Sequence, residues 1–146
     1  MKLYKALKLK KKLVGEIAKF KEQIEKNNSY LVGSINSEKY DTHSNYELLQ
    51  LKINELINLK LAINTANQKI QLKIYELSEL KALISFWNDV SCIEGSVSSD
   101  YSTSIKEYKV HYDDTKRNHL IEQYQDKVDK IQEEIDTYNY TTDISI

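Results

Sequence analysis

The stretch that decides the fold reads IEQYQDKVDKIQEEIDTY and runs from Ile121 to Tyr138. Its apolar residues recur at steps of three and four: Ile121, Tyr124, Val128, Ile131, Ile135 and Tyr138. This spacing places all six on one face of an α-helix and leaves charged side chains on the opposite face. The stretch therefore predicts an amphipathic helix, over about residues 115–138, that packs against other helices.

Two further segments carry apolar residues at heptad spacing. One covers about residues 3–26 and has its stripe at Leu3, Ala6, Leu13, Ile17, Phe20 and Ile24. The other covers about residues 44–90 and has an apolar residue at every seventh position: Leu49, Leu56, Ile63, Ile70, Leu77 and Ile84. Its companion row changes side near residues 64–68, where Asn64 and Asn67 are weak helix formers. This segment is therefore either one long helix or two, and the capping box Ser44–Glu47 predicts its start.

Two short segments between the helices have the character of strands. The first is an apolar run over about residues 30–35, and the second, about residues 105–112, alternates apolar and polar residues. We expect the second to pair with the first or with its own copy in another subunit. Gly95 and the serines after it predict a loop. The predicted fold class is mainly α: a single domain, 1–146, built as an antiparallel helical bundle or coiled coil of three to four helices that can include this short strand pair.

Composition limits the class of protein. Of 146 residues, 29% are charged and none is proline, and the longest run without a charged side chain, Asn27–Ser37, is mostly polar. A membrane-spanning helix needs about 20 apolar residues, so none is expected. The lysine-rich segment Met1–Leu13 lacks the apolar region of a signal peptide, which favours a cytoplasmic location and leaves release without a signal open. The single Cys92 cannot form a disulfide within the chain.

Charge is unevenly distributed, although the net charge is only −1. Between Met1 and Lys21, eight lysines face a single acidic residue, Glu16. The last helix and the tail are acidic, with Glu122, Asp126, Asp129, Glu133, Glu134, Asp136 and Asp143. The two segments can pair within one subunit or between two, because opposite charges beside apolar seams set the choice of helix partner. Alternatively, the lysines form a basic surface for phosphate or anionic lipid. The near-neutral balance argues against dedicated nucleic-acid binding.

Several short motifs, taken in order, point to a family. The chain opens Met1-Lys2-Leu3, has Ile63-Asn64 before Asn67, and has Tyr101-Ser102 before Ser104-Ile105-Lys106. It closes on Asn139-Tyr140-Thr141-Thr142. In this order the pieces resemble the small bacterial septicolysin-like proteins, which open with a similar apolar helix, carry I-N-x-T-N and Y-S-x-S-x-I-K motifs, and end on N-W-T-T.

The resemblance covers nearly the whole chain, with departures. Ala66 stands where the family has Thr, and Tyr140 stands where it has Trp. The glycine-bearing loop that usually follows I-N-x-T-N is missing. The resemblance implies a helical protein without catalytic motifs, and the family's name implies a membrane-active, cytolysin-like role. It assigns no functional residue to this chain.

Few residues have the spacing that catalysis or metal binding requires. His119, Glu122 and Asp126 lie on successive helical turns, as metal ligands can, but the charged face of an amphipathic helix has the same pattern. Cys92 follows Trp87 and Val90 at a helix end, which favours a structural thiol over a nucleophile. The sequence has no phosphate-binding glycine loop, no C-x-x-C and no G-x-S-x-G. We therefore expect no enzyme activity, no cofactor and no metal site.

The remaining candidate site is a contact surface. It consists of the six apolar residues of the stretch quoted first together with Asn139, Tyr140, Thr141 and Thr142. The last four are read either as a helix C-cap with Asn139 in the left-handed conformation or as a self-association contact. The leading expectation is a homo-oligomer whose partner is the protein itself. The alternatives are a membrane-active protein acting through amphipathic helices and an adaptor for another helical partner.

Overall fold

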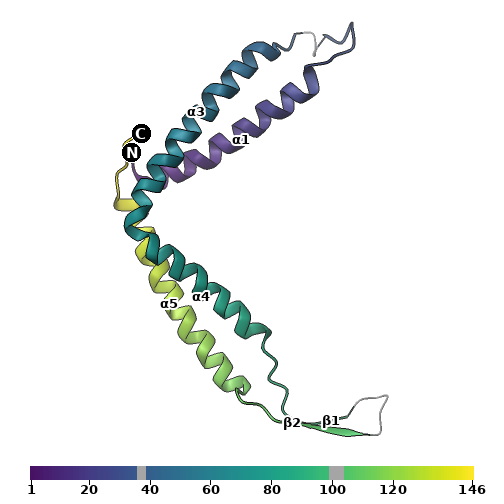
Figure 1. Cartoon of the computed structure of the whole chain (residues 1–146), viewed down its shortest axis with the longest axis vertical. Helices are drawn as coiled ribbons and strands as arrows, with labels where there is room; N and C mark the ends of the chain where they lie inside the picture. Colours follow the sequence, from purple (N-terminus) through teal and green to yellow (C-terminus); the bar gives the residue numbers. More distant parts are fainter. Residues whose placement is uncertain (36–38, 99–103) are drawn as a thin grey trace. The chain divides into compact units, whose positions relative to one another are not determined.

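The computed structural model describes residues 1–35, 39–98 and 104–146. The elements, in chain order, are α1 (Leu3–Asn27), α3 (Thr42–Asn67), the 3₁₀ turn η1 (Gln68–Ile70), α4 (Gln71–Asp89), β1 (Gly95–Ser98), β2 (Ile105–Tyr108) and α5 (Asp114–Thr141) (Figure 1). The predicted class is confirmed: the protein is mainly helical, with a short antiparallel strand pair. The residues group into two compact units where one helical domain was expected, Met1–Lys69 with Thr137–Ile146, and Ile70–Asp136.

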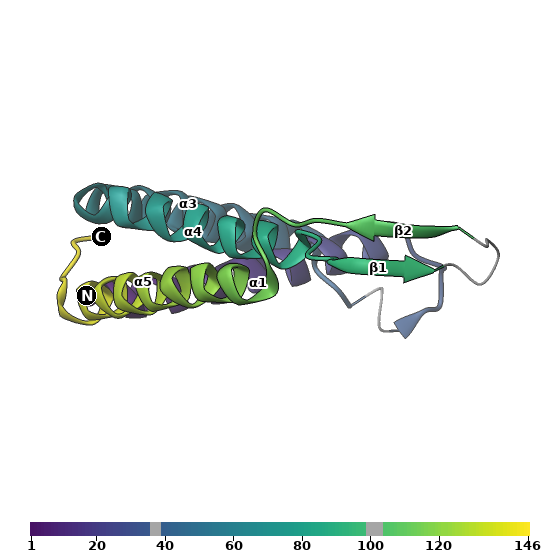
Figure 2. The same cartoon turned by 90° about the horizontal axis from the view of Figure 1, so that it is seen from below.

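The first unit is built on an antiparallel hairpin of α1 and α3, which lie side by side in both views (Figures 1 and 2). The stripe predicted for the first helix supplies much of its core. Leu3, Leu13 and Leu59 are at most 1% exposed, and burying each such side chain contributes about 1.5–3 kcal/mol. The core cluster comprises Leu3, Ala6, Leu13, Leu59, Ile63 and Ile144.

Helix α3 begins and ends at positions other than those predicted. It begins at Thr42 because the Asp41 carboxylate accepts a hydrogen bond from the Ser44 backbone N–H at 3.1 Å. The predicted capping box at Ser44 is therefore wrong, since Ser44 supplies the donor to an earlier cap. Regular α-helix ends at Asn67, and η1 follows. The long apolar segment is thus two α-helices joined by a 3₁₀ turn, with the irregularity at residues 68–70 instead of 64–68.

The second unit has α4 beside the first part of α5 (Figures 1 and 2). Lys73 of α4 forms an ion pair with Glu134 of α5. Beyond the end of α4, the guanidinium of Arg117 donates a hydrogen bond to the Val90 carbonyl at 3.1 Å. The Trp87 ring lies 5.1 Å, between centroids, from the ring of Tyr112. The last two contacts join the end of α4 to the start of α5, and the ion pair joins the start of α4 to a later turn of α5.

The strand pair is local, and the predicted pairing is wrong. β1 and β2 are antiparallel, with Gly95 opposite Tyr108 and Ser98 opposite Ile105. Residues 95–98 were predicted to lie in a loop but form a strand, because a partner close in sequence costs less loop-closure entropy than one some seventy residues away. Gly95, with φ of +88°, supplies the backbone conformation with which β1 begins. The family motif's Tyr101 and Ser102 lie outside the described residues.

Neither predicted strand has its predicted bounds. Over residues 30–35 there is no strand. The chain turns there through Gly33, with φ of +91°, and the Ser34 N–H donates to the Leu31 carbonyl at 3.0 Å. The second strand stops at Tyr108 instead of residue 112. After it comes Asp113, which lies just before α5 and whose carboxylate accepts a hydrogen bond from the Lys116 backbone N–H at 2.8 Å.

Candidate functional site

The two ends of the chain pair with each other in the first unit. The Leu3 N–H donates to the Thr142 carbonyl at 2.9 Å, and the Ile144 N–H donates to the Met1 carbonyl at 2.8 Å. The Met1 amino group donates to the Ile144 carbonyl at 2.9 Å. This pairing delivers the Ile144 side chain, 7% exposed, into the core of the α1–α3 hairpin.

Ile144 is a core residue that the sequence analysis missed. Its signal was the alternation of Thr142, Ile144 and Ile146, the period of an extended segment. In the structure Thr142 is half-buried, Ile144 is buried and Ile146 is exposed. This side of the tail is therefore buried only as far as Ile144, and Ile146 beyond it is exposed.

Lys2 also joins the two ends of the chain, through an ion pair. Its ammonium donates to the Asp143 carboxylate at 2.7 Å and to the Thr141 carbonyl at 2.9 Å. The hydrogen bond from Lys2 lowers the pKa of Asp143 from its ordinary value, because it favours the ionised carboxylate. One lysine of the basic N-terminal segment thus pairs with one acid of the C-terminal segment inside the first unit.

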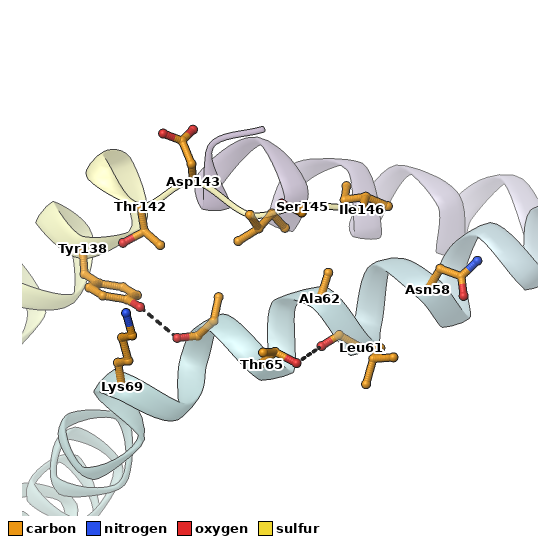
Figure 3. Close-up of a pocket in the computed structure, with 12 residues that line it drawn as sticks. Asn58, Leu61, Ala62, Thr65, Lys69, Tyr138, Thr142, Asp143, Ser145 and Ile146 are labelled. Atoms are coloured by element: carbon orange, nitrogen blue, oxygen red, sulfur yellow. Dashed lines mark hydrogen bonds between the residues drawn. The ribbon is translucent and has the colours of Figure 1, made fainter.

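A groove of about 610 Å³ lies beside the paired ends (Figure 3). One wall comes from α3 and η1 and the other from the end of α5 and the tail. Leu61 and Ile146 flank it and are 66% and 62% exposed. The described residues that line it are Asn58, Leu61, Ala62, Thr65, Ala66, Lys69, Tyr138, Thr142, Asp143, Ile144, Ser145 and Ile146. Among these, only Lys69 and Asp143 have charged side chains.

Tyr138 links the two walls of the groove at one end. Its hydroxyl donates a hydrogen bond to the Ala66 carbonyl at 2.8 Å, which joins α5 to α3 within the first unit (Figure 3). Its half-buried ring packs against the core cluster. Tyr138 is thus the one residue of the stripe quoted first that belongs to the groove.

The rest of that stripe lies in the second unit. Val128, Ile131 and Ile135 are 5%, 9% and 8% exposed, and Ile121 and Tyr124 are half-buried. The burial of the first three takes place inside a single chain, so they are core residues where an interface was predicted. Apolar periodicity predicts which helix face is covered, but it does not say whether the same chain or a second chain covers that face.

The predicted C-cap at Asn139 is wrong, because α5 continues to Thr141. None of the described non-glycine residues has a positive φ. Within this last turn, the Thr141 hydroxyl donates to the Thr137 carbonyl at 2.8 Å. The exposed Tyr140 ring lies 4.6 Å, between centroids, from the ring of Tyr4. Asn139 and Thr142 are half-buried.

The candidate metal and nucleophile positions do not assemble into sites. Nε2 of His119 lies 3.1 Å from the Gln123 amide nitrogen on the same helix. Over the described ranges, no group of three or more His, Cys, Asp or Glu side chains has a metal-binding arrangement. Cys92 is half-buried, with its sulfur 3.2 Å from the Tyr112 carbonyl oxygen. This contact places the thiol in the structural link between α4 and α5.

No family model, no curated protein and no solved structure matches the chain. The resemblance to septicolysin-like proteins therefore stays a prediction from the sequence motifs. Across residues 1–35, 39–98 and 104–146, no helix combines the length and the hydrophobicity that a membrane span requires.

Proposed function

We propose that this chain is a non-enzymatic helical protein that self-associates into a homo-oligomer. The observation that carries this proposal is the groove beside the chain ends, with Leu61 and Ile146 exposed on its walls. The cores of subunit interfaces are depleted of charged residues and rich in apolar ones. The groove has this composition, and a second copy that covers it removes both side chains from water.

Helix α3 supports the proposal because it carries more apolar surface than α1 covers. Leu49, Leu59 and Ile63 are buried, whereas Leu51 and Leu61, on other faces of the same helix, are 64% and 66% exposed. A helix at the surface of a monomer normally has one apolar stripe. Apolar residues beyond that stripe are typical of a helix that meets a further partner.

The membrane-active alternative has less support. An interfacial helix inserts its apolar face into lipid, but that face of α1 is already used. Leu3, Leu13 and Ile17 are 0%, 1% and 8% exposed, so insertion requires the α1–α3 hairpin to open first. If the protein is a monomer in solution and releases dye from anionic vesicles, this alternative is favoured over self-association.

The test is the mass of the protein in solution, measured by light scattering over a range of concentrations. We expect a mass above that of one chain, and a lower mass for Leu61→Lys, which places a charge in the groove. The matched control is Val32→Lys, because Val32 is 88% exposed and lies outside the groove. A single-chain mass at every concentration would refute self-association. An unchanged mass for Leu61→Lys would refute the role of the groove.

A further inference from the structure

The outer face of α5 carries one sign of charge. Its acidic residues follow at steps of four and three and form the acidic stripe, defined as Glu122, Asp126, Asp129, Glu133 and Asp136. All five are exposed, and helix geometry places them opposite the buried Val128, Ile131 and Ile135. None of the five forms an ion pair with another described residue. Five carboxylates on one helix face repel each other unless a cation or a basic partner lies against them.

The outer face of α1 carries the opposite sign. Its basic stripe, defined as Lys5, Lys8, Lys12 and Lys19, follows at steps of three, four and seven. All four lysines are exposed and lie away from Leu3, Ala6 and Leu13, which face the core. Lys12 reaches Glu16 at 3.6 Å, but the other three have no ion-pair partner among the described residues.

The two stripes match in length and share a seven-residue repeat. Each extends over fourteen residue steps, from Lys5 to Lys19 and from Glu122 to Asp136, which is about 21 Å along a helix. Each also follows a heptad pattern. Complementary charges arranged along two surfaces select which surfaces meet and fix their register. Two straight helices of this kind can therefore place their charges opposite one another over the full length of both stripes.

We propose that the basic stripe of one copy docks on the acidic stripe of a second copy. This proposal rests on the self-association proposed above and names the surfaces that direct it. Exposed ion pairs contribute little affinity individually, about 0–1 kcal/mol, so the apolar groove supplies affinity while the stripes select the docking faces. Every copy offers both stripes, so the contact can be made twice in a two-fold dimer or continue head to tail through further copies.

Charge reversal tests the proposal on the full chain. One variant reverses the basic stripe, K5E/K8E/K19E, and another reverses the acidic stripe, E122K/D126K/E133K; a third carries both sets. We expect each single-stripe variant to raise the dissociation constant on the order of tenfold or more, measured by light scattering against concentration. The chain with both stripes reversed regains the wild-type mass, because its charges are again complementary. An equimolar mixture of the two single-stripe variants also regains it, because the stripes of different chains meet.

Matched controls reverse three exposed charges elsewhere: K60E/K81E/K116E for the lysines and E76K/E79K/D89K for the acids. We expect these control variants to keep the wild-type mass, and circular dichroism checks that every variant keeps its helical content. The proposal is overturned if wild type self-associates and the stripe variants do so equally well, or if both control sets weaken assembly as much. If the doubly reversed chain regains the wild-type mass but the mixture of the two single-stripe variants does not, the stripes pair within one chain and the proposal is overturned. The proposal is also overturned if wild type and K5E/K8E/K19E have the same mass but only wild type binds anionic vesicles. In that case the basic stripe meets a lipid surface. A wild-type protein that is monomeric throughout refutes the proposed function itself, which is a separate result.

Discussion

Tyr138 is the residue whose side chain makes the clearest measurable contribution to the first unit. Its hydroxyl donates to the Ala66 carbonyl at 2.8 Å, and the ring packs on the core. Tyr138→Phe keeps the ring and removes only the donor. We expect the free energy of unfolding to fall by about 0.5–1.5 kcal/mol, toward the lower end because the groove lets water reach the freed carbonyl. Urea denaturation followed by circular dichroism measures the change.

Tyr140 provides the matched control two residues further along the same helix. Its ring is 61% exposed and contacts Tyr4, so Tyr140→Phe removes a hydroxyl that has no hydrogen bond among those found in the described residues. We expect the urea concentration at which half of this variant is unfolded to equal that of the wild type. Equal losses in the two variants would show that the Tyr138 hydrogen bond is not the cause of the effect.

At the scale of elements, the α1–α3 hairpin carries a pH-dependent contact. The Lys52 ammonium of α3 lies 3.2 Å from the Glu16 carboxylate of α1, and this ion pair lowers the pKa of that carboxyl from its ordinary value of 4.5. A carboxylate with a depressed pKa in the folded state stabilises the protein above its unfolded pKa and loses this contribution as the pH falls through its folded value. We expect Glu16→Gln to lose less stability than wild type between about pH 5 and pH 3, measured by urea denaturation at each pH.

Glu25→Gln is the control for this element, because Glu25 is exposed on the same helix and has no ion-pair partner among the described residues. It should keep the acid sensitivity of the wild type. If Glu16→Gln and wild type lose stability in parallel as the pH falls, the contact between the two helices is not responsible.

The helices were predictable from the sequence, whereas their caps and the strand partners were not. Heptad periodicity is a local property, and it correctly identified the buried face of α1 at Leu3 and Leu13. The cap at Asp41 was missed because Ser44-Glu47 imitates a capping box, and only the backbone geometry shows which residue accepts the hydrogen bond. The role of Ile144 was missed because it depends on pairing with Met1, at the other end of the chain. Period and composition thus determine the elements, and long-range contacts determine the groove.

At the scale of the whole molecule, the opposite charges of the two stripes make salt a diagnostic of the assembly. Salt screens charges over a Debye length that falls from about 10 Å at 0.1 M to about 3 Å at 1 M. Raising NaCl should therefore weaken wild-type association, since it screens an attraction. For K5E/K8E/K19E the same salt should strengthen association, since it screens the repulsion between two acidic faces while the apolar contact at the groove remains. Sedimentation velocity at low and high NaCl measures both trends, with the doubly reversed chain expected to follow wild type. Two trends of the same sign would show that the groove alone, without the stripes, brings the copies together.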